Sequence, residues 1–456
     1  MQIQQLDRSR VIVLTDITNE PDDEQSMVRF LCYVNEFDVE GLVATTSCWL
    51  RNRVAPEQIE ERVIAYDQVR NNLLTHAPNY PPMTFLMDRI KTGLPVYGMD
   101  GVGQGKTSAG SQLIVEAVDK PDPRPVWVCV WGGANCLAQA LWEVQQSRST
   151  AEVDRFVSKL RVYTISDQDN SAPWIRQQFP NLFYIVSPGY EENDGGGYHH
   201  STWVGISGDK FHGRFEGANF EIVDNPWLDQ HIRQNHGPLG ALHPRTKYLL
   251  EGDTPTFLYL VPNGLGVPDQ PNYGSWGGRY EFYTPNQQPW HYQQETHPIW
   301  TDTTDRVIGT DDKTHQTNKA TIWRWREAYQ HDFAARIDWT IADRFQDANH
   351  NPIAGFAGDT SRGVVYLTIR SGEAVQLDAT STTDPDGDRV SVDWFQYKEV
   401  GSLEIDLKIE VQSDLSANFV APQVEQAETV HIILEVKDSG EPCLYSYRRI
   451  VVEIQP

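Results

Sequence analysis

Four acidic residues, Asp16, Glu20, Asp22 and Asp23, fall within eight positions near the start of the chain. Carboxylates this close repel one another unless a cation lies among them. Ca²⁺ takes about six to eight oxygen ligands, mostly carboxylates and backbone carbonyls. Capping of the helix expected to begin near Asp23 would explain Asp22 but leaves the other three acids without a role. The cluster therefore favours a Ca²⁺ site over a simple helix cap.

The position of this cluster supports the interpretation. Residues 10–14 form an apolar run that predicts a buried strand, and residues 23–35 show helical spacing. The acids lie between these two segments, at the end of the predicted strand. In open α/β sheets, ligands bind at the carboxyl ends of the strands. We therefore expect Asp16 to lie at the ligand-binding edge of a sheet.

The elements that position the cluster alternate between strand and helix. Further apolar runs predict strands at residues 39–46, 126–130, 160–165, 182–186 and 256–261. Helical spacing is found at residues 56–74, 111–118, 136–146 and 320–339. This order predicts an α/β fold in which helices flank a mainly parallel sheet.

The pattern changes after about residue 345. Short alternating runs separated by turn signals predict strands at residues 364–369, 374–379, 390–397, 404–410, 429–436 and 448–453. They fit an all-β, immunoglobulin-like sandwich of roughly 100 residues. We therefore divide the chain into an α/β domain at residues 1–344, which contains the acidic cluster, and a β-sandwich domain at residues 345–456.

The 456-residue chain has 38 basic and 63 acidic residues, a net charge of −25. This excess of acids argues against nucleic acid or an anionic membrane as a partner, because phosphates would be repelled. No apolar run reaches the ~20 residues that span a bilayer. The first residues lack the features of a signal peptide, which leaves a cytoplasmic protein, or a periplasmic or secreted one whose signal has been removed. A homo-oligomer remains open.

The chain carries 14 tryptophans and 19 tyrosines, many of them in segments rich in glycine and proline. Aromatic faces stack on sugar rings, so this distribution favours a carbohydrate ligand, although loop packing would also explain it. The five cysteines include no pair with CxxC spacing. The sequence therefore predicts neither a disulfide framework nor a zinc site of that type.

The acidic segment resembles a known signature. Nucleoside hydrolases carry Asp-x-x-x-Asp-Asp after their first strand, and there it binds Ca²⁺ and a ribose. In the present chain Asp16 is followed by Asp22 and Asp23, so the loop is two residues longer. The form Thr-Asp-x-x-Asn-Glu-Pro-Asp-Asp resembles a separate, nucleoside-hydrolase-like family that includes proteins described as cellulose-binding. The resemblance covers nearly the whole chain, including a C-terminal β domain.

The resemblance implies a set of metal ligands. Residues 131–135, Trp-Gly-Gly-Ala-Asn, are similar to a turn in which nucleoside hydrolases offer Ca²⁺ a backbone carbonyl, here that of Ala134. Residues 251–255 are similar to the segment that supplies a late Asp ligand, here Asp253. The implied Ca²⁺ shell is Asp16, Asp23, Asp253 and the Ala134 carbonyl. A glycine turn that caps a helix and a polar turn are the alternatives for the two segments.

The expected sugar contacts rest on the same resemblance. Nucleoside hydrolases hold sugar hydroxyls with acidic and amide side chains after the strand that corresponds to residues 160–165. Histidines and aromatic residues of later loops would add contacts or wall the pocket, with surface turns and structural histidines as the alternatives. The residues expected to bind substrate are Asp22, Asn19, Asp167, Asp169, Asn170, His199, His200, Glu251, Trp276 and Arg279.

The implied chemistry is hydrolysis at an anomeric carbon. Asp16 would orient or deprotonate the attacking water, and Glu20, placed beside the cluster by the longer loop, would protonate the leaving oxygen. His199 and His200 are alternative acids. The first hypothesis is a Ca²⁺-dependent glycoside hydrolase, with furanosides among its candidate substrates. A non-catalytic carbohydrate-binding protein, such as a cellulose binder, and an N-ribosyl nucleoside hydrolase are the alternatives.

Overall fold

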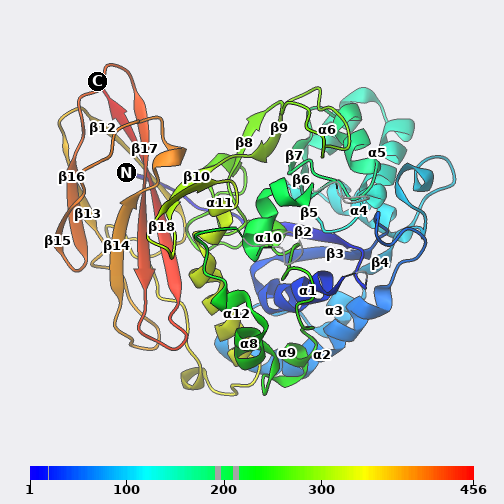
Figure 1. Ribbon diagram of the computed structural model, residues 1–456, viewed down its shortest axis with the longest axis horizontal. Helices are drawn as coiled ribbons and strands as arrows, with labels where there is room; N and C mark the ends of the chain where they lie inside the picture. The colour runs from blue at the N-terminus through cyan, green and yellow to red at the C-terminus, as the bar shows by residue number, and fades with distance from the viewer. Residues whose placement is uncertain (19, 191–196, 209–214) are drawn as a thin grey trace.

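The first domain is built around an eight-stranded sheet, counted over residues 1–18, 20–190, 197–208 and 215–456, which the computed structural model describes (Figure 1). In sheet order the strands are β4 (Ile90–Thr92), β3 (Asp38–Ala44), β2 (Arg10–Thr15), β5 (Val126–Val130), β6 (Leu160–Thr164), β7 (Phe183–Val186), β9 (Ile299–Asp302) and β8 (Tyr280–Tyr283). Neighbouring strands are parallel except β8 and β9. The predicted mainly parallel sheet is confirmed.

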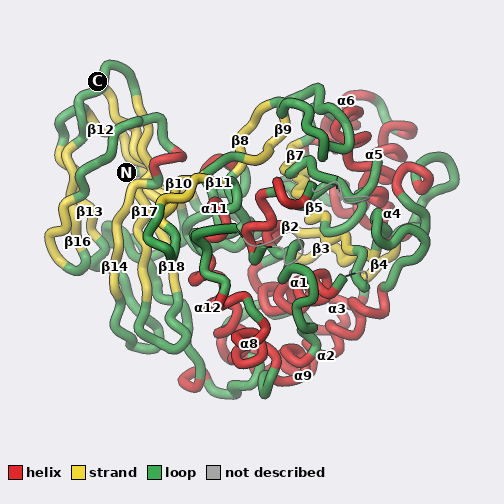
Figure 2. Tube along the Cα trace, in the orientation of Figure 1, coloured by secondary structure: helices red, strands yellow, loops and turns green. Residues whose placement is uncertain are grey.

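Helices cover both faces of this sheet (Figure 2). Alternate residues of a strand point to opposite faces, and in β2 Val11 and Val13 enter one buried cluster while Ile12 and Leu14 enter another. The first cluster includes residues of α1 (Pro21–Tyr33), α2 (Pro56–His76) and α12 (Arg326–Trp339). The second includes residues of α4 (Ala109–Asp119), α5 (Asn135–Ser147), α6 (Thr150–Ser158) and α7 (Ser171–Gln178). No helix in the described part of the chain is long and apolar enough to cross a membrane.

Shorter helices and a small hairpin complete the first domain. The helices are α3 (Met83–Met87), α8 (Asn225–Leu228), α9 (Gly237–Ala241), α10 (Pro255–Leu258) and α11 (Ala320–Trp323). The hairpin strands are β10 (Asp305–Ile308) and β11 (Thr314–Thr317). Residues 256–261 were expected to form a strand, but the first three of them belong to helix α10. A short buried apolar run fits either element, and Pro255 in the first turn favours the helix. The helix expected at residues 320–339 is divided between α11 and α12.

The second domain is a two-sheet β structure, as predicted. One sheet has the order β1 (Gln2–Gln4), β12 (Val364–Arg370), β18 (Tyr445–Gln455), β17 (Glu428–Lys437) and β14 (Ser391–Gln396). The other has the order β13 (Ala374–Asp378), β16 (Ser416–Val420) and β15 (Glu410–Ser413). Residues of both sheets share one apolar cluster. The strand predicted at residues 404–410 is wrong, because β15 begins only at Glu410, and β16 was not predicted.

The first and second domains are in contact at two places. Strand β1, which lies within the predicted first domain, pairs antiparallel with β12 of the second. Asp305 of β10 is fully buried and accepts hydrogen bonds from Arg279, Arg324 and the hydroxyl of Tyr397. Although burial opposes it, the two guanidinium groups hold the pKa of Asp305 below its ordinary value. The Tyr397 hydroxyl therefore joins the second domain to a buried ion-pair cluster of the first.

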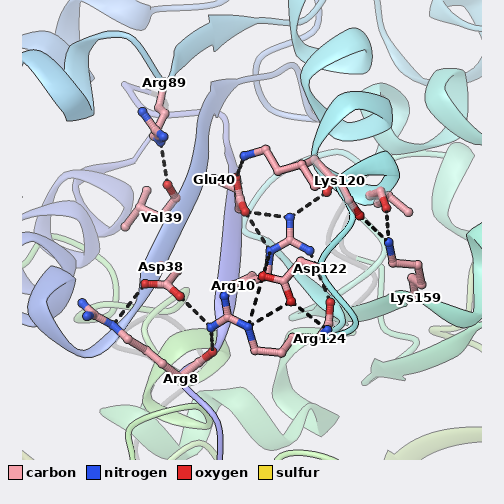
Figure 3. Close-up of polar contacts among 12 residues, drawn as sticks. Arg8, Arg10, Asp38, Val39, Glu40, Arg89, Lys120, Asp122, Arg124 and Lys159 are labelled. Atoms are coloured by element: carbon pink, nitrogen blue, oxygen red, sulfur yellow. Dashed lines mark hydrogen bonds and ion pairs between the residues drawn. The ribbon is translucent and has the colours of Figure 1, made fainter.

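Ion pairs close the amino-terminal edge of the large sheet (Figure 3). Arg10 begins β2, is buried, and pairs with Glu40 of β3 at 2.7 Å. Its guanidinium also donates to the carbonyl of Ala117 at the end of α4. Arg124 pairs with Asp38 and Asp122 at 2.6 and 2.7 Å. These pairs occupy the edge opposite to Asp16, where a ligand site was not expected.

Candidate functional site

The acidic cluster lies at the carboxyl edge of the sheet, as its sequence position predicted. Strand β2 ends at Thr15, so Asp16 is the first residue beyond it, and α1 begins at Pro21. The residue at the helix cap is Glu20, which makes no side-chain capping bond. Asp22 lies inside the first turn and is not the cap. The capping alternative therefore does not account for Asp22.

Three carboxylates from two distant segments converge beside Asp16. Oxygen atoms of Asp22, Asp23 and Asp253 all lie within 4.8 Å of one another, and all three residues are buried. Asp253 is 1% exposed, and its Oδ2 has no hydrogen-bond partner among the described residues. A buried carboxylate oxygen without a partner is costly, which makes it a strong candidate for a cation ligand.

The electrostatics of the cluster favour a bound cation. Burial raises the pKa of Asp16 to about 6. Burial, together with the charges of neighbouring acids, raises the pKa values of Asp22, Asp23 and Asp253 well above their ordinary range. Clustered carboxylates that titrate this high lack sufficient neutralisation. An all-oxygen set of this kind fits a hard cation such as Ca²⁺.

Hydroxyl groups from two strand ends hold the carboxylates in place. Ser47 Oγ donates to Asp16 Oδ2, and Thr15 Oγ1 donates to Asp23 Oδ1. Ser47 Oγ also accepts the backbone amides of Trp49 and Leu50, at 3.0 and 3.1 Å. Sequence reasoning missed Thr15 and Ser47, because a hydroxyl that follows a strand is too common to stand out. Ser47 links Asp16 to the loop that carries Trp49.

At two glycines of the predicted turn, carboxylates lie so close to the backbone that no side chain would fit. A Cβ atom at Gly132 would lie 2.5 Å from Asp16 Oδ1, and one at Gly133 would meet Asp169 Oδ2 and the Thr46 carbonyl. In the later segment, a Cβ at Gly252 would lie 2.8 Å from Asp22 Oδ2. The turn therefore serves to let side chains approach the backbone closely.

We expect Gly132→Ala to displace Asp16 and to destabilise the protein by about 1–3 kcal/mol, because the new methyl group overlaps the carboxylate. Urea unfolding measures the loss. Asp16→Ala removes the carboxylate oxygens, so the cost of Gly132→Ala should be smaller in that background. Equal costs in the two backgrounds would contradict the contact.

The Ala134 carbonyl, the expected backbone ligand of Ca²⁺, lies at the start of α5. Ala134 precedes α5, and its carbonyl oxygen accepts the amide of Ala138 at 2.9 Å, in the first turn of the helix. Its own amide hydrogen-bonds Asp169. The peptide is thus aligned with the helix and its carbonyl is directed along the helix axis. The helix starts at Asn135, one residue earlier than expected. Because a carbonyl oxygen has a second lone pair, its role as a Ca²⁺ ligand stays a prediction.

Asp167, Asp169 and Asn170 follow β6 and were expected to contact a sugar. Of these three, Asp169 is the one whose charge acts on Asp16. Its Oδ1 accepts the amide of Ser171 at the start of α7, its buried Oδ2 has no partner among the described residues, and its charge raises the pKa of Asp16. Asp167 instead forms a two-pronged ion pair with buried Arg176 at 2.8 Å. Asn170 accepts the amide of Met99. The last two contacts give Asp167 and Asn170 structural roles.

Several other expected sugar contacts have structural partners. Glu251 is fully buried and pairs with Arg29 at 2.6 Å and with His243 at 3.1 Å. Trp276 is buried and packs edge-on against Tyr447 of the second domain. Arg279 is buried and pairs with the buried Asp305 of β10 at 2.7 Å. These side chains are thus committed to packing, and the predicted pocket wall at Trp276 and Arg279 is not supported.

The loop between β2 and α1 is partly described. Asn19 lies outside the described residues. Thr18 has φ of 92°, an uncommon backbone conformation for a β-branched residue, and its hydroxyl accepts a hydrogen bond from Arg53. Glu20 is partly exposed, and its charge raises the pKa values of Asp22 and Asp253. Such strained backbone is often kept at functional sites.

Aromatic residues surround this edge of the sheet. Trp49 is 40% exposed, and its indole donates to the hydroxyl of Tyr198 at 3.1 Å. His200 is exposed and stacks on Trp290, with ring centroids 3.6 Å apart. Burial and the charge of Asp169 raise the pKa of Tyr97. The Arg51 guanidinium lies over the Tyr97 ring. His199 precedes this stack, and its carbonyl accepts the Lys319 ammonium. Trp49 is linked to Asp16 through Ser47, and Tyr97 lies within reach of the charge of Asp169.

Comparison with known proteins identifies the family. The model for the nucleoside-hydrolase-like domain of cellulose-binding Sde182 matches residues 10–280, more than half of the chain. The chain belongs to this family. The model for the C-terminal domain of cellulose-binding protein Sde0182 matches residues 374–454. The Sde182 family match thus covers both domains, and it confirms the resemblance carried by the acidic loop.

A solved structure agrees with this assignment. A nucleoside hydrolase-related hypothetical protein from Saccharophagus degradans, associated with carbohydrate metabolism, is 37% identical, with a TM-score of 0.83. The alignment covers 98% of this chain and 100% of that one. The effector protein XOO4466 and the type III effector XopQ, the latter in complex with adenosine diphosphate ribose, are each 10% identical, with TM-scores of 0.31 and 0.32. They cover 65% and 74% of this chain, and 88% and 96% of their own. A search of curated proteins returns no match.

Proposed function

We propose that this Sde182-family protein is a Ca²⁺-dependent glycoside hydrolase that acts on carbohydrate. The observation that carries the proposal is the convergence of four buried carboxylates at the ligand-binding edge of the sheet, one with an unpartnered oxygen. A protein that only binds sugar by stacking and hydrogen bonds has no need to concentrate uncompensated charge in this way. The family description and the relative associated with carbohydrate metabolism support the substrate class.

The residues divide into two roles. Asp16, Asp22, Asp23 and Asp253 would hold Ca²⁺. When bound, Ca²⁺ orients sugar hydroxyls and makes a bound water more acidic. Asp16 is oriented by Ser47, and it would orient the attacking water or accept its proton. Asp22 joins the proposed shell beside the ligands expected from the resemblance.

A sugar leaving group sets a further requirement. An alkoxide is a poor leaving group, so cleavage of an O-glycoside needs an acid that delivers a proton to the departing oxygen. Glu20 is the candidate, because it is partly exposed and close enough for its charge to act on Asp22 and Asp253. It lies in the stretch where this loop is longer than that of nucleoside hydrolases. This difference favours glycosides over nucleosides as substrates.

Two alternatives remain in the same site. A non-catalytic carbohydrate-binding protein is favoured by the family description as cellulose-binding and by the exposed Trp49. An N-ribosyl nucleoside hydrolase is favoured by the fold alone. The substrate panel described next separates all three candidates.

The test is sugar release from a panel of furanosides, β-glucan oligosaccharides and nucleosides, with Ca²⁺ and with a chelator. We expect release of reducing sugar from at least one glycoside, loss of release on chelation and recovery on adding Ca²⁺. Release from inosine or uridine alone would favour the nucleoside hydrolase. Retention on cellulose without release from any substrate would favour the binding protein and overturn the proposal.

We expect Trp49→Ala to weaken carbohydrate binding about tenfold, which corresponds to about 1.4 kcal/mol. The reason is that Trp49 presents an exposed ring on the loop that Ser47 fixes to Asp16. Trp49→Phe, which keeps an aromatic face, should retain most of the affinity. Phe282→Ala, at an exposed position on edge strand β8, is the matched control. Affinity is measured by calorimetry with the best substrate or with cello-oligosaccharides.

A further inference from the structure

A second group of metal-ligand side chains lies at the contact between the two domains. Glu327 and His331 are one turn apart on α12, and Cys443 lies in the connection between β17 and β18. One ligand atom from each lies within 4.8 Å of the others. Their chemistry differs from that of the acidic cluster, because thiolate and imidazole are preferred by Zn²⁺ rather than by Ca²⁺.

The distances fit a tetrahedral ion. Zn²⁺ binds sulfur at about 2.3 Å and nitrogen or oxygen at about 2.0–2.1 Å, which separates two tetrahedral ligands by about 3.5 Å. His331 Nδ1 lies 3.2 Å from Cys443 Sγ, and Cys443 Sγ lies 3.8 Å from Glu327 Oε1. Both separations are within about 0.3 Å of the tetrahedral spacing. Only small side-chain movements are therefore needed to close the three ligands around one ion.

We propose that Glu327, His331 and Cys443 form a zinc site that links α12 of the first domain to the β17–β18 connection of the second. Water would complete the four ligands, since the site is partly exposed. The acidic cluster and this site would then hold different ions, a hard cation at the sheet edge and Zn²⁺ at the interface.

Neighbouring groups can adapt to the ion. Lys437 Nζ and the hydroxyl of Tyr445 donate to Glu327 Oε1 at 2.8 and 2.7 Å, and Lys437 also hydrogen-bonds the Cys443 sulfur. Both donors can remain bound to coordinated carboxylate and thiolate, as outer donors commonly do at metal sites. On binding, the Cys443 thiol releases its proton to solvent. His331 Nδ1 gives up its contact with the Cys443 carbonyl, 3.1 Å away, and the ring proton moves to Nε2.

The other four cysteines are buried, so a thiol reaction at Cys443 can be followed separately. Cys32, Cys48, Cys129 and Cys136 are buried, and Cys443 alone among the five is partly exposed. A thiol reagent applied to the folded protein should therefore modify Cys443 first. Zinc bound to its thiolate should block that reaction.

The test uses the full-length protein with Co²⁺ as a spectroscopic substitute for Zn²⁺. We expect an intense thiolate-to-cobalt charge-transfer band with the visible bands of tetrahedral Co²⁺, both displaced by Zn²⁺. Cys443→Ser should abolish the charge-transfer band, and Glu327→Gln should weaken binding at least tenfold. Asp67→Asn, at an exposed position on α2, is the matched control and should leave the spectrum unchanged.

A second measurement protects the test from misfolding of a variant. In the unsubstituted protein, Zn²⁺ should slow alkylation of Cys443 at least tenfold, as followed by peptide mass spectrometry, whereas Ca²⁺ should not. A cobalt spectrum without a thiolate band, or alkylation unaffected by Zn²⁺, would overturn the proposal. Neither result depends on hydrolase activity, so the proposed function could fail while the zinc site stands.

Discussion

Replacing Asp16 by Asn should lower the rate of glycoside hydrolysis about 1,000-fold, a typical contribution of a positioned proton acceptor. The amide is nearly the same size as the carboxylate and keeps an oxygen for the Ser47 hydroxyl, so the loop should stay in place. It cannot take a proton from water. The measurement is kcat on the best substrate from the glycoside panel, at saturating Ca²⁺.

Asp67→Asn, at an exposed position on α2, is the control for loss of a negative charge and should keep full activity. Comparison of Asp16→Asn with the unsubstituted protein also separates an enzyme from a binding protein. If Asp16→Asn binds carbohydrate and releases sugar as well as the unsubstituted protein does, Asp16 has no catalytic role. If neither protein releases sugar from any substrate, the site only binds.

Glu20→Gln addresses the leaving group. The loss should be large for an unactivated glycoside and small for a substrate such as a nitrophenyl glycoside, whose leaving group needs little protonation. Asp16→Asn should impair both substrates, because water attack is needed in each case. Full activity of Glu20→Gln on an unactivated substrate would exclude Glu20 as the acid.

The sequence was sufficient to predict the parts of the site that are locally concentrated. Asp16, Asp22 and Asp23 lie in one loop between a strand and a helix, and the order of elements places that loop at the sheet edge. Asp253 was predicted only from the family resemblance, because its segment alone fits a polar turn equally well. The sheet and the β-sandwich followed from hydrophobic periodicity, which is reliable for long or regular patterns.

Contacts between distant segments could not be predicted in this way. Glu251 looked like a ligand because the residue to which it is paired, Arg29, is 222 positions away. Trp276 looked like a pocket wall because its partner Tyr447 belongs to the second domain. The same limit concealed the proposed zinc site, in which His331 and Cys443 are 112 positions apart and no CxxC pair exists. An unpaired polar or aromatic residue in a sequence is therefore weak evidence for a ligand.

The acidic cluster also has consequences for stability. A buried carboxyl whose pKa is raised binds its proton more tightly in the folded than in the unfolded chain. The pKa of Asp16 rises from 3.8 to about 6 on folding. Its contribution to folding stability is therefore present at low pH and is lost as the pH rises through that range. The raised pKa values of Asp22, Asp23 and Asp253 act in the same direction. The four acids should thus destabilise the cation-free protein at neutral pH.

We therefore expect Ca²⁺ to raise the Tm at pH 7.5 by about 3 °C when its concentration is about 100 times its Kd. The increase should shrink toward pH 5, where protons compete for the same oxygens. Differential scanning calorimetry with Ca²⁺ and with a chelator measures both effects. Mg²⁺ at the same concentration is the control for ionic strength, and an equal increase with both ions would argue against a specific site.

Asp253→Asn should reverse the sign of this effect. In chelator at pH 7.5 the variant should be more stable than the unsubstituted protein, because it removes one of the repelling charges and its amide nitrogen can donate to a neighbouring carboxylate. With Ca²⁺ in excess the order should invert, since the variant lacks a ligand. A structural role for Asp253 predicts a loss of stability under both conditions. Only a cation held by these carboxylates makes the same substitution stabilising without Ca²⁺ and destabilising with it.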